Sequence, residues 1–143
     1  MARRVLRIWT YRMSIRIVRL GSPRAPGEGL RIGTVRRPPR GVPKHDFARA
    51  DYYDVWLPEL APSEPLVRAA RAATTERQWQ AFRRRYLGEL SKAPASRLLN
   101  LLASLSHTTN LSVGCYCEVE ARCHRSVLRE AFAERGANVV GQE

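Results

Sequence analysis

The sequence has no long apolar run, and this absence excludes a simple membrane anchor. No stretch approaches the roughly 20 apolar residues that a membrane-spanning helix needs. Residues 1–21 are basic, and arginines interrupt their apolar residues, so no apolar segment of signal-peptide length is present. We therefore expect a soluble, cytoplasmic protein without a membrane partner.

Cysteine is also scarce. The 143 residues contain three cysteines. An odd number argues against the disulfide framework of a secreted protein. Several catalytic signatures are missing as well, because no Walker loop, GxGxxG turn or serine nucleophile elbow occurs. No cofactor is therefore expected.

Acidic residues are rare where the basic charge is greatest. Residues 1–44 contain twelve Lys or Arg and a single acid, Glu28, and thus hold most of the net charge of +12. A field of this sign attracts polyanions, either nucleic acid or phosphorylated small molecules. The chain has 23 Arg against 2 Lys, so a compositional preference for arginine explains the same charge without any ligand. Both interpretations stay open.

The composition is that of a globular protein, with 44% hydrophobic and 27% charged residues. A chain of this length suits one domain, which buries roughly two thirds of its unfolded surface. We interpret residues 13–143 as a single α/β domain and residues 1–12 as a basic N-terminal extension or a first strand.

Apolar patterning predicts strands that alternate with helices. The expected strands are 14–20, 30–35, 53–57, 111–117 and a short last one at 137–140. The expected helices start near Ser63, Thr75, Ser96 and His124. This order predicts an α/β fold: a single three-layer domain with a mostly parallel central sheet flanked by helices.

The clearest helix follows Thr75. Thr75 and Gln78 have the spacing of a capping box, and Trp79, Phe82 and Tyr86 recur on one face. We expect these aromatic residues to lie in the core and not to form a platform for stacking bases.

All three cysteines lie in one stretch, GCYCEVEARCHRSVL (Gly114–Leu128), which is predicted to be a strand, a connection and a helix. Ligands of α/β sheets bind at the carboxyl ends of strands, where the next helix offers free N–H groups. Cys123 and His124 stand at that helix start, which favours a thiolate. They are the candidate catalytic residues, as nucleophile and acid/base, although the sequence does not establish that the protein is an enzyme.

These cysteines have alternative roles. Cys115, Cys117, Cys123 and His124 supply the four donors of a zinc site, but the spacing lacks a C-x₂₋₄-C knuckle, and adjacent Cys123 and His124 are expected to diverge, so no metal site is predicted. A disulfide between Cys117 and Cys123 is within reach. Cys115 is interpreted as a small buried hydrophobe. Cys123 and Arg129 match C-x₅-R, but helix-type residues between them exclude a phosphate-binding loop.

Arginines indicate an anion site at the same place. Arg122 and Arg125 flank the helix start, and Arg36 and Arg40 come from the proline-rich VRRPPRG segment, which we expect beside it. Guanidinium groups bind phosphate or carboxylate in a bidentate manner. The predicted function is therefore binding of a small phosphate- or carboxylate-bearing ligand, with nucleic-acid binding by the basic first third as the alternative. If Arg125 instead has a purely structural role, we expect it to pair with a carboxylate such as Glu118.

The segments VRRPPRGVPK, WLPELAPSEPL, WQAFRRRYLGEL and GCYCEVEARCHRSVL, followed by ERGA, resemble the family called domain of unknown function 488 from about Ser14 to Gly136. The resemblance implies a compact α/β domain and a candidate site more than an activity. It places the family's arginine loop on Arg36, Pro39, Arg40 and Gly41. It places a C-x-E…C-H-R signature on Cys117 and on Cys123 to Arg125.

Overall fold

A computed structural model describes residues 13–140 of the chain. The predicted extension or strand at residues 1–12 lies outside this range. Within it, no helix combines the length and the apolar character that crossing a membrane requires.

The described residues form a parallel sheet of four strands in the order β1-β4-β2-β3. The strands are β1 (Ile15–Arg19), β2 (Leu30–Gly33), β3 (Val55–Trp56) and β4 (Leu111–Cys115). The central β4 pairs with β1 on one side and with β2 on the other. The predicted α/β fold with a parallel sheet is confirmed. Residues 137–140 contribute only an isolated bridge, Ile15 to Val139, where a last strand was expected.

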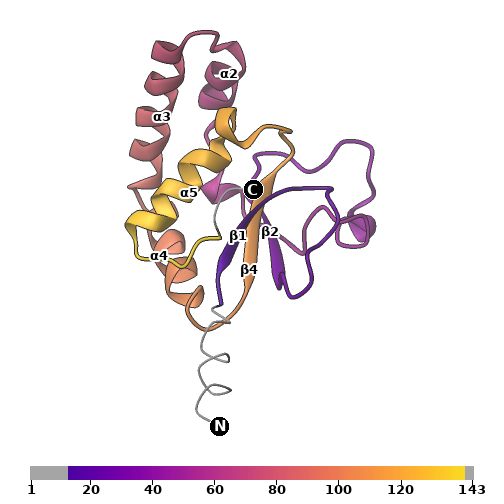
Figure 1. Ribbon diagram of the computed structural model, residues 1–143. Coiled ribbons are helices and arrows are strands. Elements are labelled where there is room, and N and C mark those ends of the chain that lie inside the picture. The colour runs from indigo at the N-terminus through magenta and orange to yellow at the C-terminus, as the bar shows by residue number, and fades with distance from the viewer. Residues whose placement is uncertain (1–12, 141–143) are drawn as a thin grey trace.

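The α-helices cover one face of the sheet (Figure 1). They are α2 (Glu64–Ala72), α3 (Glu76–Leu90), α4 (Ala95–Leu105) and α5 (His124–Glu134). Their apolar faces and the inward side chains of β1, β2 and β4 form one large buried cluster. Burial of this surface is the main force that holds the helices to the sheet.

The opposite face is covered by connecting segments, which Figure 1 shows in indigo and purple beside the sheet. A short 3₁₀ helix, η1 (Lys44–Asp46), lies in this layer. A second, smaller apolar cluster under it contains Val18, Leu20, Val35, Tyr53, Cys115 and Cys123. Two of the three cysteines, Cys115 and Cys123, belong to this smaller cluster.

Local sequence signals explain where α3 begins. The Gln78 amide donates to the Thr75 hydroxyl at 3.2 Å, and the Thr75 amide donates to the Gln78 side chain at 3.2 Å, which completes the predicted capping box. Trp79, Phe82 and Tyr86 are buried, as expected for core residues. The expected cap at Ser96 is wrong, because α4 begins at Ala95 and its N-cap is Pro94.

Candidate functional site

Parallel strands place their carboxyl ends along one edge of the sheet, and the candidate residues gather there. β2 ends at Gly33 and β4 at Cys115, and α5 begins at His124. Cys123 is the N-cap of α5: its backbone is extended (φ −122°, ψ 153°), and its sulfur accepts the Arg125 amide at 3.5 Å. The chain thus turns back over the strand ends immediately before the helix.

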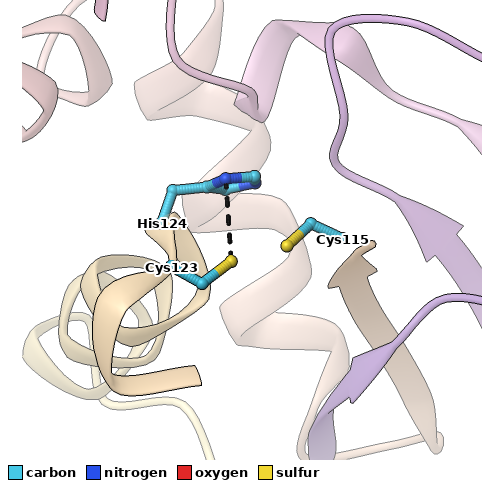
Figure 2. A group of neighbouring side chains, drawn as sticks. All are labelled: Cys115, Cys123 and His124. Carbon is cyan, nitrogen blue, oxygen red and sulfur yellow. Dashed lines mark hydrogen bonds between the residues drawn. The ribbon is translucent and has the colours of Figure 1, made fainter. Parts of the chain in front are cut away.

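Two cysteines and a histidine form a compact cluster at this edge (Figure 2). The Sγ atoms of Cys115 and Cys123 and a ring nitrogen of His124 all lie within 4.8 Å of one another. Both cysteines are 2% exposed. The expected divergence of Cys123 and His124 is wrong, because the extended N-cap residue lets both side chains face Cys115. Cys115 was expected to be only a buried hydrophobe and is in fact part of the cluster.

The histidine ring is held by a backbone carbonyl outside the cluster. His124 Nε2 lies 2.7 Å from the carbonyl oxygen of Thr34, the residue that follows β2. A carbonyl only accepts, so Nε2 carries the proton and Nδ1 offers a lone pair. Nδ1 lies 4.0 Å from the Cys123 sulfur. Burial lowers the pKa of His124 to about 4, so the ring is neutral at pH 7.

Tyr86 of α3 packs against the same ring, with the two ring centroids 5.8 Å apart in an edge-on arrangement. Its hydroxyl donates to the carbonyl of Leu60. Neither Tyr86 nor Thr34 was expected at the site. Thr34 follows a predicted strand directly, which places it at this edge, whereas nothing in the helical pattern distinguishes Tyr86 from an ordinary core residue.

The third cysteine, Cys117, is exposed beside the cluster. Hydrogen bonds from Cys115 and Cys123 lower the pKa of Cys117, and the positive charge of Arg125 acts in the same direction. The hydrogen bonds with Cys117 and Cys123, together with burial, raise the pKa of Cys115. All three cysteines are free thiols in the structure, and the Cys117–Cys123 disulfide stays a prediction.

Arg125 is buried beside the thiols, with 4% of its surface exposed. Its Nη2 donates to the carbonyl of Cys117 at 2.6 Å, while its buried Nε has no hydrogen-bond partner among the described residues. The suggested partner Glu118 instead lies 3.7 Å from Arg19. The positive charge of Arg125 therefore lies against sulfur and a carbonyl, and the carboxylate of Glu120 acts on it as well.

The other predicted anion-binding arginines have different surroundings. Arg36 donates through Nε and Nη2 to the carbonyls of Pro62 and Ala61, each at 3.1 Å. Arg40 is exposed. Arg122 points to α3, where it contacts Glu76 at 2.8 Å and lies over the ring of Trp79. Arg36 and Arg40 thus belong to the loop after β2, whose residue Thr34 contacts His124 of α5. Arg122 is instead held against α3 by its ion pair with Glu76.

The geometry permits two kinds of chemistry. A neutral imidazole with its lone pair toward a thiol is the arrangement of a nucleophile and its base. The same lone pair and the neighbouring sulfurs are also donors that a soft metal ion prefers. The C-x₅-R alternative is excluded, because Arg129 lies on α5 and forms an ion pair with Glu120 at 2.8 Å.

The fold and this cluster define a small parallel α/β protein with a Cys–His centre at the carboxyl edge of its sheet. Residues 15–136 match the family model described as the active DUF488-N3 subclade. The chain belongs to the domain of unknown function 488 family, as its arginine loop and C-x-E…C-H-R residues indicated. Neither the curated proteins nor the solved structures include a match to the chain.

Proposed function

We propose that the protein binds a small anion, a phosphate- or carboxylate-bearing molecule, between the loop after β2 and the start of α5. The observation that carries this proposal is the 2.7 Å contact between Thr34 O and His124 Nε2. It joins two arginine-bearing stretches that are 90 positions apart in the sequence. The description of the matching subclade as active supports a ligand-binding or reactive centre.

The charges at this edge support an anionic ligand. Arg36 is hydrogen-bonded to carbonyls, which orient its guanidinium but do not cancel its charge. Arg40 is exposed and forms no hydrogen bond or ion pair within residues 13–140. An arginine whose charge is not compensated is a ready donor for phosphate or carboxylate oxygens.

A small ligand is favoured over nucleic acid, because several arginines of the basic first third are already paired. Each of these side chains contacts a carboxylate within the described chain: Arg19, Arg24, Arg31 and Arg37. Their charges stabilise the fold, which leaves less positive potential for a polyanion.

Calorimetric titration of the full chain with inorganic phosphate and with phosphorylated small molecules tests the proposal. Arg40→Ala and Arg36→Ala should each weaken binding by about tenfold or more, since each removes a charged donor. Arg97→Ala, which removes an exposed arginine of α4, is the matched control and should leave binding unchanged. Equal weakening by all three variants, with a steep dependence on salt, would instead indicate diffuse polyanion binding.

A further inference from the structure

The Cys–His centre has the donor geometry of a metal site. In a tetrahedral zinc site the Zn–S and Zn–N bonds of about 2.3 and 2.0 Å place the ligand atoms about 3.5–3.8 Å apart. The Cys123 sulfur and His124 Nδ1 are already 4.0 Å apart. The set formed with Cys115 lies within 4.8 Å, so closure by about 1 Å or less gives the tetrahedral spacing.

The orientation of His124 fits a metal ligand. Its Nε2–H donates to Thr34 O, so the lone pair of Nδ1 faces the sulfurs. Histidines that bind metals usually donate their second ring nitrogen to a carbonyl or carboxylate, which fixes both the tautomer and the ring. Here the second partner is in place, and it is the carbonyl of the residue that follows β2.

Two backbone amides donate to the sulfurs, and such contacts stabilise the negative charge that metal-bound thiolates carry. The Cys117 amide donates to the Cys115 sulfur at 3.4 Å, and the Arg125 amide donates to the Cys123 sulfur at 3.5 Å. The buried guanidinium of Arg125 lies beside both thiols. Three thiolates and one divalent zinc ion have a net charge of −1, which this single cation balances.

Cys117 supplies the fourth donor. It follows Cys115 by two residues, and its amide donates to the Cys115 sulfur at 3.4 Å, so it stands next to the set of Cys115, Cys123 and His124 and would join it on metal binding. It is exposed and thus closes the cluster from the solvent side. Burial favours metal binding over nucleophilic catalysis at this cluster. Cys115 and Cys123 are each 2% exposed, and such buried sulfurs are reached more readily by an ion than by the reacting atom of a substrate.

We propose that Cys115, Cys117, Cys123 and His124 bind one zinc ion, which ties the end of β4 to the start of α5. This site adjoins the proposed anion site, because His124 also contacts Thr34 at the start of the arginine loop. It assigns Cys123 and His124 to the metal and not to covalent or proton-transfer chemistry. With four protein ligands the site is closed, as structural zinc sites are.

Metal analysis of the full chain, purified without a histidine tag and without chelator, is the first test. We expect about one zinc ion per chain, as a four-ligand site holds. Cys117→Ser, Cys123→Ser and His124→Ala should lose it. His45→Ala removes an exposed histidine outside the cluster and should keep the full zinc content. Full zinc content in Cys117→Ser would overturn the four-ligand site.

Cobalt(II) provides a second readout that does not depend on the variants folding well. The reduced, metal-free wild-type chain, titrated with cobalt(II), should develop thiolate-to-cobalt absorption with the intensity of a tetrahedral site. Arg125→Gln should weaken metal affinity by about 10–100-fold, as loss of a supporting contact does. A wild-type chain that holds no zinc and gives no cobalt spectrum under reducing conditions would overturn the proposal. Rapid alkylation of Cys115 and Cys123 in the native purified chain would do the same.

Phosphate titration of the same samples separates the two proposals. Zinc content without phosphate binding rejects the anion site alone. Phosphate binding by a chain that takes up neither metal rejects the zinc site alone.

Discussion

Arg31 and Glu28 form a fully buried ion pair on the loop-covered face of the sheet. Arg31 Nε and Nη2 contact the two carboxylate oxygens of Glu28 at 2.7 and 2.9 Å, and the two side chains are 0% and 2% exposed. Ser112 of β4 donates to the same carboxylate at 2.8 Å. This pair therefore joins the layer of connecting segments to the central strand.

Breaking the pair should destabilise the protein strongly. Glu28→Gln or Arg31→Met leaves one buried polar group without its partner, and such changes cost about 3–5 kcal/mol in free energy of unfolding. Urea denaturation followed by tryptophan fluorescence measures this. Arg49→Ala removes the arginine of an exposed pair with Asp46 and is the control, with little change expected. A loss in Glu28→Gln as small as that in the control would show that the pair is not essential.

The same carboxylate should make stability depend on pH. Burial raises the pKa of Glu28, but hydrogen bonds from Arg31, Ser112 and the Ala25 amide outweigh it and hold the pKa below its usual 4.5. A folded-state pKa below the unfolded one stabilises the protein above the unfolded pKa, and this stabilisation is lost as the pH falls through the folded value. We therefore expect the free energy of unfolding to fall below about pH 4.5 and to fall less steeply in Glu28→Gln. Denaturation curves between pH 3 and 7 test this, and parallel slopes would contradict it.

Two glycines should respond to alanine in opposite directions. A Cβ on Gly114, in the central strand, would lie 2.3 Å from the backbone oxygen of Val18, so the strands would have to separate. A Cβ on Gly88, in α3, meets nothing within 4 Å. Gly88→Ala should raise stability by about 0.5–1 kcal/mol through helix propensity. Gly114→Ala should lower the midpoint of thermal unfolding, and an unchanged midpoint would contradict the close approach of β1 and β4.

The elements of the fold could be predicted because their signals are local. β-branched residues indicated β1, and the Thr75–Gln78 spacing indicated the start of α3, where the structure has a capping box. The role of Arg31 could not be predicted in this way. An arginine in a strand normally reaches solvent, and its burial depends on Glu28 and on segments that cover the sheet only after folding.

The site was predicted in part. Its place at the carboxyl edge followed from the order of strand and helix, and Cys123 and His124 do lie there. The convergence of Cys115 with them depends on the extended backbone of one residue, Cys123, which no periodicity reveals. The ion pair of Arg122 involves Glu76, 46 positions away, and local patterns carry no information on such pairings.

The place of β4 in the sheet has a consequence for the chain as the ribosome makes it. β1 and β2 both pair with β4 and not with each other, and β4 is the last of the four strands in the sequence. Until residues 111–115 have emerged, only the two-residue β2–β3 ladder is available, and so small a ladder is not stable alone. The sheet and its thiol cluster should thus assemble only after β4 and the start of α5 have been made, with the helices of the middle segment already synthesised.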